Sequence, residues 1–196
     1  MKYLITALIA YLLGSFCASI PLTKKHYGVD VRSQGSGNAG ATNVARVFGL
    51  RAGLITLSCD MAKTVAAMLL GRWLCGEQGM ALAGVLCIIG HCFPVYFGFR
   101  GGKGVSVGAA LGLITGWKVF LVIMCVFFIA AVLSRKVSLG SISAAMTLPV
   151  ASVIFNVSPQ ILAMNIFSGL LVVFMHRSNI RRLIAGTEGD FKPKNL

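Results

Sequence analysis

GSGNAGATNVAR, residues 35–46, is a polar and glycine-rich stretch between hydrophobic segments that look long enough to cross a bilayer. Its glycines, Gly35, Gly37 and Gly40, let backbone N–H groups approach a ligand closely. Donors suited to phosphate oxygens accompany them, namely Ser36, Asn38, Thr42, Asn43 and Arg46. The alternative is an ordinary turn between two membrane helices, because Gly, Asn and Ser also dominate turns.

The composition around this stretch indicates an integral membrane protein. Hydrophobic residues make up 57% of the chain and charged residues 12%, whereas charged residues run near a quarter in soluble domains. Apolar and polar residues alternate only weakly, which argues against a transmembrane barrel. We therefore predict an all-α integral membrane protein, a polytopic helical bundle with glycine-rich cytoplasmic loops, formed by residues 1–196 as a single domain.

The hydrophobic segments predict the number of membrane helices. They run over residues 3–20, 54–74, 80–97, 105–133, 137–155 and 159–174. The fourth is about 29 residues long and exceeds the roughly 20 that span hydrocarbon, and Gly116, Trp117 and Lys118 interrupt it. Splitting it gives about seven membrane segments. Residues 105–115 then cover only about 16 Å, so they are either a short crossing or a tilted, half-penetrating helix that lines a cavity.

The basic residues predict the orientation. The net charge is +13, and after the split most basic residues fall on one face of the membrane. That face is predicted to be cytoplasmic, with the N-terminus outside, in a bacterial inner membrane that the chain crosses several times. Residues 3–20 resemble a signal peptide after Lys2, but their length favours a retained helix. Nucleic acid is not expected as a partner.

A second glycine-rich stretch, GHCFPVYFGFRGGKGV, covers residues 90–105. Gly101, Gly102 and Gly104 surround Lys103 at the start of a predicted helix, and exposed N–H groups at a helix N-terminus attract phosphate. The spacing is not that of a Walker P-loop, which disfavours nucleotide hydrolysis. Positive-inside anchoring is the alternative role for the basic residues. His91 would place a titratable group near the anion site, although a single histidine is often structural.

Charged and polar residues also occur within and after later segments. Asp60 and Lys63 lie three residues apart in an apolar segment, so they share a helix face and can pair, for packing or for catalysis. A third cluster joins Ser138, Leu139, Gly140 and Ser141 to polar residues near the C-terminus. These are His176, Arg177, Asn179, Arg181, Arg182 and Glu188. The C-terminal part is alternatively an amphipathic helix on anionic headgroups.

The six cysteines lie in or beside apolar runs, without the close pairs of metal or redox sites. We expect them to be reduced packing residues, with Cys92 as the alternative nucleophile because it follows His91. Neither a metal nor a cofactor is expected.

The three clusters, in this order, closely resemble the motifs of the bacterial acyl-phosphate:glycerol-3-phosphate acyltransferase family over nearly the whole chain. VSLGSI and HRSNIRRLIAGTE resemble its third motif. The resemblance maps functional positions onto Ser36, Asn38, Thr42, Asn43, Arg46, His91, Lys103, Ser141, His176, Arg177, Asn179 and Glu188, and Asp60 and Lys63 resemble further family positions. More distant acyltransferases use His and Asp five positions apart, but Val31 follows His26 at that distance, so this dyad is absent.

The resemblance implies an enzyme that transfers an acyl group from acyl phosphate to the 1-hydroxyl of glycerol 3-phosphate, giving lysophosphatidic acid. It implies these two substrates and the lipid bilayer as partners, without cofactor, metal or obligate protein partner. Our hypothesis is that Ser36, Asn38, Arg46 and Lys103 hold phosphate. The hydroxyl proton goes either to His91 or to a substrate phosphate oxygen. The main rival is a membrane transporter of a phosphorylated metabolite.

Overall fold

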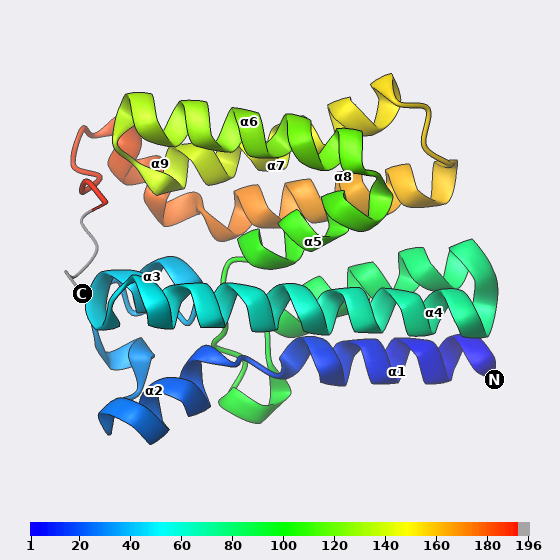
Figure 1. Ribbon diagram of the computed structural model, residues 1–196, viewed down its shortest axis with the longest axis horizontal. Helices are drawn as coiled ribbons and strands as arrows, with labels where there is room; N and C mark the ends of the chain where they lie inside the picture. The colour runs from blue at the N-terminus through cyan, green and yellow to red at the C-terminus, as the bar shows by residue number, and fades with distance from the viewer. Residues whose placement is uncertain (192–196) are drawn as a thin grey trace.

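The computed structural model describes residues 1–191, which are helical and contain no strand (Figure 1). The elements are α1 (Lys2–Ser15), α2 (Ser19–Tyr27), η1 (Val31–Ser33), α3 (Ala41–Phe48), α4 (Leu50–Cys92), η2 (Val95–Phe97), α5 (Val105–Thr115), α6 (Trp117–Ser134), α7 (Val137–Ile154), α8 (Pro159–Met175) and α9 (Arg177–Ile184). The long helices run along one common direction, and the short α2, α3 and α9 lie together at one end (Figure 1). We call this end the motif end.

Helix α4 contains two of the predicted segments and folds back on itself. Its backbone leaves the helical region at Cys75 and at Gly76, where φ is +64°, and the two arms then run side by side (Figure 1). Gly71 and Gly79 face each other across the arms, so a Cβ on either would meet the backbone of the other. Small residues let membrane helices approach this closely. Helix α1 packs along α4, with Gly14 against the backbone of Cys87.

The first predicted segment is not one continuous helix. Helix α1 ends at Ser15, Phe16 is extended with ψ of 99°, and α2 begins at Ser19. The break leaves carbonyl groups without helical partners, and the ammonium group of Lys63 donates to two of them, at 3.0 Å to Gly14 and 2.7 Å to Phe16. A contact from another helix therefore ends α1 earlier than hydropathy predicts.

Helices α5 to α8 form the second half of the bundle. The predicted division at Gly116 is confirmed, because α5 ends at Thr115 and α6 begins at Trp117. Helix α5 has 11 residues and packs against α4, α6 and α8. The seven predicted apolar segments lie mainly on helices, although the first is broken between Ser15 and Ser19 and the third runs past the end of α4 at Cys92. By length and composition, four candidate spans occur within residues 1–191, or five if α8 and α9, bent by 58°, form one span.

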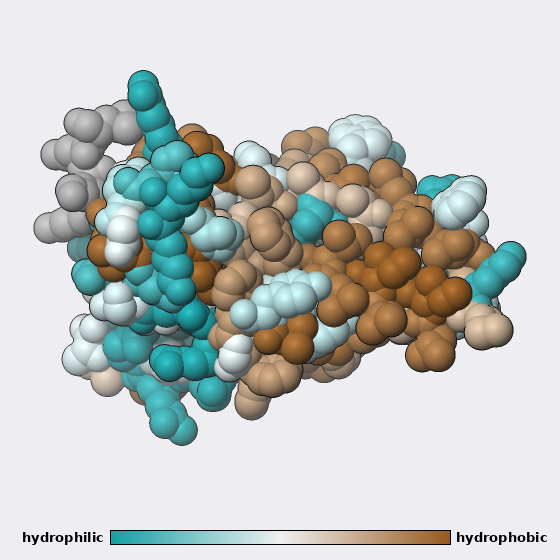
Figure 2. All heavy atoms as spheres, turned by 90° about the horizontal axis from the view of Figure 1, so that it is seen from below, coloured by the Kyte–Doolittle hydropathy of each residue, from teal (hydrophilic) through white to brown (hydrophobic). Residues whose placement is uncertain are grey.

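Hydrophilic and hydrophobic residues separate along the molecule. Figure 2 shows hydrophilic residues gathered at the motif end and hydrophobic residues over much of the remaining face. The motif end carries the basic residues of the loops and of α9, as the charge pattern predicts. One basic residue that this pattern omits is Arg72, which is exposed shortly before the break of α4 at the opposite end.

Candidate functional site

The first motif is half loop and half helix. Gly40 is the N-cap of α3, so Thr42, Asn43 and Arg46 lie on a helix rather than in the predicted loop. The Asn43 side chain is buried under the loop and organises it. Its amide donates to the carbonyls of Val31, Gln34 and Asn38 at 3.2, 3.0 and 3.0 Å. The side-chain amide of Asn43 therefore makes its hydrogen bonds within the protein, whereas the sequence predicted that it would contact substrate.

The outer side of this loop is accessible. Ser36 and Thr42 are exposed and Arg46 is half-buried. The Ser36 N–H donates to Asn43 Oδ1 at 2.9 Å, which turns the chain at Gly35. Gly35 has φ of +56°, and a Cβ there would collide with the Asn43 side chain, so only glycine fits this turn.

The second motif packs against the first and against α4. The Gly102 N–H donates to the His91 carbonyl at 3.0 Å, and a Cβ on Gly102 would strike the His91 ring. The Asn38 amide donates to the Gly101 carbonyl at 3.4 Å and so links the two motifs. Gly104, with φ of +81°, is the N-cap of α5, which confirms that this stretch opens a helix.

His91, Lys63 and Asp60 form a buried group beneath the second motif. The predicted pair is present, with Lys63 Nζ 2.9 Å from Asp60 Oδ1. Lys63 Nζ also lies 3.1 Å from His91 Nδ1. His91 is 2% exposed and Asp60 1%, and Gly102 covers the histidine ring. These side chains therefore support the loop from below and do not face solvent at the motif end, where the sequence placed His91. Of the two roles expected for Asp60 and Lys63, packing and catalysis, their burial favours packing over contact with substrate.

The third motif meets Lys103. Lys103 Nζ donates to Asn179 Oδ1 at 2.5 Å, and the Asn179 amide donates to Glu188 at 2.7 Å. Arg182 Nε holds the other Glu188 oxygen at 2.6 Å. Lys136, just before α7, donates to the Glu188 carbonyl at 2.8 Å. The structure thus brings together residues that lie far apart in the sequence.

The charge around Lys103 favours an anion. The pKa of Lys103 is lowered to about 8, mainly by burial of its ammonium group and also by the nearby charges of Arg182 and Arg46, whereas Glu188 opposes the change. A half-buried cation with other cations close by gains energy from a doubly charged phosphate group. The group of Arg46, Lys103 and Arg182 is therefore suited to phosphate.

Other residues of the third motif occupy different surroundings. His176 is buried, and its Nδ1 donates to the Val172 carbonyl at 2.7 Å, which leaves Nε2 as an acceptor. Ser141 is buried and donates to the Val137 carbonyl at 2.9 Å. Arg177 is exposed and stacks on Phe174, so the structure does not bring it to Lys103.

A partly open apolar cavity lies between α5, α6, α7 and α8, with about 40 Å³ of space accessible to a water-sized molecule. Val105, Ser141 and Val172 line it near the motif end, and Ile123 and Leu148 line it further into the bundle. Val105, Gly108 and Ala109 of α5 line this cavity, which agrees with one of the two alternatives for residues 105–115. The cavity therefore extends from the interior of the bundle to the first turns of α5 and α7, where Val105 and Ser141 lie.

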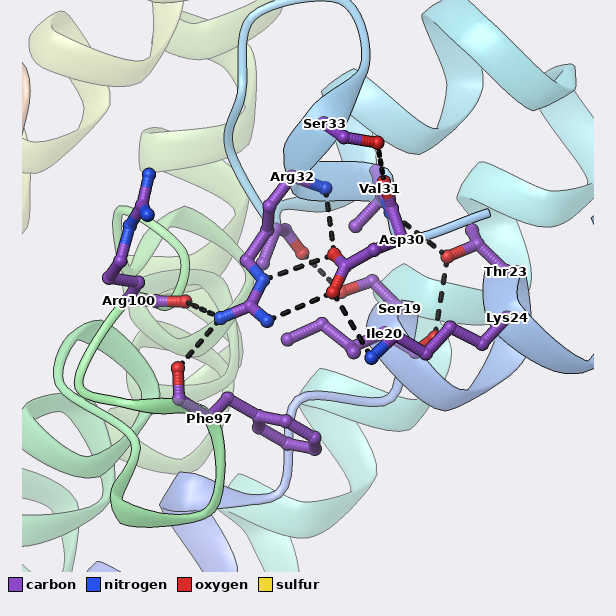
Figure 3. Close-up of polar contacts among 11 residues, drawn as sticks. Ser19, Ile20, Thr23, Lys24, Asp30, Val31, Arg32, Ser33, Phe97 and Arg100 are labelled. Atoms are coloured by element: carbon purple, nitrogen blue, oxygen red, sulfur yellow. Dashed lines mark hydrogen bonds and ion pairs between the residues drawn. The ribbon is translucent and has the colours of Figure 1, made fainter. Parts of the chain in front are cut away.

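Two residues of the site, Arg32 and Asp30, were not predicted from the sequence. Arg32 binds Asp30 and also the second motif's loop, and Figure 3 shows its guanidinium between them. The sequence signal that could have revealed them is an acidic and a basic residue two positions apart just before the glycine-rich stretch.

The cysteines in the described residues are free, and Cys92 is buried. Residues 1–191 contain no cluster of three or more His, Cys, Asp or Glu side chains that could hold a metal ion.

The fold and this site define a polytopic helical membrane protein with a cationic, glycine-rich site at one end of the bundle. Residues 4–186 match the family model for glycerol-3-phosphate acyltransferase, and the chain belongs to that family. The glycerol-3-phosphate acyltransferase of Thermoanaerobacter pseudethanolicus is 40% identical over 194 residues, covering 99% of this chain and 98% of the relative. That of Shouchella clausii is 41% identical over 202 residues, covering 97% and 96%.

Solved structures are similar over the same length. The crystal structure of PlsY (YgiH), an integral membrane glycerol 3-phosphate acyltransferase, in its glycerol 3-phosphate form has a TM-score of 0.88 and 34% identity. Its lysophosphatidic acid form has a TM-score of 0.87 and 33% identity. Each match covers 98% of this chain and 96% of the other. The all-helical membrane fold predicted from the sequence is therefore confirmed.

Proposed function

We propose that this protein transfers an acyl group from acyl phosphate to the 1-hydroxyl of glycerol 3-phosphate, releasing lysophosphatidic acid and phosphate. One observation carries the proposal: an apolar cavity reaches Ser141 at the end of the bundle where Lys103 and Arg46 concentrate positive charge. Membership of the glycerol-3-phosphate acyltransferase family supports it, as do related structures in glycerol 3-phosphate and lysophosphatidic acid forms. The donor and the residue roles are our assignment.

The cationic group binds phosphate in this proposal. Ser36 lies on the accessible side of the first loop, and Arg46 and Lys103 supply full charges from two different motifs. Both proposed substrates carry phosphate, so two such groups must be neutralised within a small volume. Lys103 would exchange its bond to Asn179 for a phosphate oxygen, while Glu188 and Arg182 keep Asn179 in place.

The apolar cavity holds the acyl chain, with the carbonyl carbon at the end near Ser141. The acceptor oxygen attacks this carbon and gives a tetrahedral intermediate, whose bond to the phosphate oxygen then breaks. Acyl phosphate is a mixed anhydride with a good leaving group, so alignment and charge stabilisation suffice. The hydroxyl proton passes to a substrate phosphate oxygen, because His91 is covered by Gly102 and bonded to Lys63.

We place this site on the cytoplasmic side of a bacterial inner membrane, with the N-terminus outside. The basic residues of the loops and of α9 gather at the motif end, and the positive-inside rule assigns such an end to the cytoplasm. Phosphorylated, water-soluble substrates would reach the site from that side, and the lipid product would leave into the bilayer.

The purified protein tests the proposal directly. With labelled glycerol 3-phosphate, we expect labelled lysophosphatidic acid when acyl phosphate is the donor, and none above background with acyl-CoA. Absence of product with either donor would reject the enzyme proposal. Uptake of labelled glycerol 3-phosphate into vesicles that contain the protein would then support the rival transporter.

Replacing His91 separates a base from a supporting residue. We expect His91→Gln to raise the KM for glycerol 3-phosphate, because the ring that supports Gly102 is altered, and to leave the shape of the pH profile unchanged. A general base instead supplies about 10²-fold or more of kcat with little effect on KM. A large fall of kcat at constant KM would therefore assign the proton transfer to His91.

Gly108 tests the cavity. It lines the cavity, and a Cβ there meets no atom within 4 Å, so Gly108→Leu should fill part of the space without a backbone clash. We expect kcat/KM for a long acyl phosphate relative to a short one to fall by about tenfold or more, since each methylene contributes roughly 1–3 kcal/mol of discrimination. Gly116→Leu is the matched control, because Gly116 also has open space but lies outside the cavity. If the ratio of kcat/KM for long and short acyl phosphates is unchanged in Gly108→Leu, the acyl chain does not bind in this cavity.

A further inference from the structure

Arg32 lies between the first two motifs, and nearly all of its hydrogen-bonding capacity is used there. Its Nε donates to Asp30 Oδ1 at 3.1 Å and one terminal nitrogen donates to Asp30 Oδ2 at 2.9 Å. The other terminal nitrogen donates to the Phe97 carbonyl at 2.7 Å and to the Arg100 carbonyl at 3.3 Å. Figure 3 shows the guanidinium group between the Asp30 carboxylate and the two carbonyls.

Asp30 is itself fixed, so it anchors the guanidinium. Asp30 is the N-cap of η1, and its Oδ1 accepts the Arg32 N–H at 3.0 Å. Lys24 Nζ lies 3.3 Å from the other oxygen. The hydrogen bonds from Arg32 hold the pKa of Asp30 well below its usual range, so the carboxylate stays charged across the physiological pH range. The Asp30 and Arg32 side chains are 22% and 20% exposed, which makes this pair less screened than an open surface pair.

The segment that Arg32 binds is closed on itself by the Phe97 and Phe99 N–H groups, which donate to the Pro94 carbonyl at 3.1 and 2.9 Å. Among the hydrogen bonds of the described residues, the side chain that holds the Phe97 and Arg100 carbonyls is Arg32. After η2, Gly98 and Phe99 both have positive φ, of 64° and 58°, and Phe99 is 59% exposed. The chain then reaches Gly101 and Gly102, which are bonded to α4, and next Lys103. Two carbonyls of this segment thus depend on one guanidinium that belongs to the segment preceding the first motif.

We propose that Arg32 is a positioning residue for acyl transfer: with Asp30 it braces the 95–100 loop against the first motif and so fixes Lys103 relative to Arg46. This inference rests on the proposed function of Arg46 and Lys103. Arg32 does not touch substrate in this account. A planar fork is required, because it must meet two carboxylate oxygens on one side and two carbonyls on the other. Lysine at this position carries the same charge but cannot make these bonds together.

The first test measures kinetics with acyl phosphate and glycerol 3-phosphate. We expect Arg32→Gln to lower kcat/KM for glycerol 3-phosphate by at least about tenfold, because charge-assisted hydrogen bonds of this kind are lost. Arg32→Lys should resemble Arg32→Gln, whereas a merely electrostatic attraction of phosphate would survive in it. The matched control is Arg100→Gln, which removes the same charge from an exposed side chain of the same loop (Figure 3). Equal effects of Arg32→Gln and Arg100→Gln would overturn the proposal.

A second test does not depend on activity. Hydrogen–deuterium exchange of the amides in residues 95–104 should be faster by about tenfold or more in Arg32→Gln than in Arg100→Gln, at unchanged temperature of unfolding. Asp30→Asn should reproduce part of this increase, and the Asp30→Asn, Arg32→Gln double variant should be no worse than Arg32→Gln alone. Unchanged exchange in Arg32→Gln would refute the brace. Faster exchange in Arg32→Gln, together with a wild-type protein that makes no product, would instead reject the proposed function alone.

Discussion

Lys103→Gln is expected to lower kcat/KM for acyl transfer by at least about 10²-fold, which is the scale of removing one donor that stabilises developing charge. Lys103 links the second motif to the third through its hydrogen bond to Asn179, and its charge lies close to that of Arg46. The variant keeps a donor for Asn179 but loses the charge. Lys118→Gln, at the opposite end, is the control and should retain activity.

The pH dependence follows from the same group. The pKa of Lys103 is lowered to about 8, so its ammonium group is charged below that pH and neutral above it. Phosphate binding needs the charged form, and kcat/KM should therefore fall as the pH rises through about 8. Lys103→Arg should remove this fall, because arginine stays protonated. An alkaline limb that persists in Lys103→Arg would show that another group titrates.

Lys63→Met is expected to destabilise the fold by about 3–5 kcal/mol, because it leaves the buried Asp60 carboxylate without its partner. Lys63 also holds the carbonyls of Gly14 and Phe16 at the end of α1. Thermal unfolding in detergent measures this effect. Lys24→Met is the matched control, since Lys24 pairs with Asp30 at a 56% exposed side chain and should change the stability by at most about 1 kcal/mol.

A double variant separates the charge pair from the packing. Asp60→Leu with Lys63→Met removes both charges, and it should unfold at a temperature closer to that of the wild type than Lys63→Met does. If Lys63→Met alone unfolds like the wild type, the buried network does not stabilise the bundle, and the explanation for the end of α1 fails with it.

The helices could be predicted because their signals are local. Apolar length marked each segment, and Gly116 marked the division between α5 and α6. The break at the end of α1 has no such signal, since it depends on Lys63 from another helix. Helix α3 did have a local sequence signal, because Gly40 and Gly49 cap the run from Ala41 to Phe48. The prediction of a loop followed the composition of the motif and overlooked these caps.

The sequence predicted which motifs form the site better than it predicted what each residue does there. The three motifs do meet, since Asn38 of the first bonds to Gly101 of the second and Lys103 of the second bonds to Asn179 of the third. However, polar residue types alone do not reveal whether a side chain faces a ligand or the interior. Asn43 and His91 are polar residues in the right motifs, and both are turned inward by contacts across the fold. Arg32 was missed as part of the site because the partners that tie it to the second motif are the backbone carbonyls of Phe97 and Arg100, which no sequence pattern identifies, and only its pairing with Asp30 has a local signal.

A structure of this protein with bound glycerol 3-phosphate tests the central claim that three motifs build one phosphate site. We expect the phosphate within hydrogen-bond distance of both Lys103 Nζ and the Arg46 guanidinium, with the 1-hydroxyl directed toward Ser141 at the end of the cavity. Density for the ligand at the opposite end of the bundle, or on only one of these two cations with Lys103 still bonded to Asn179, would contradict the account.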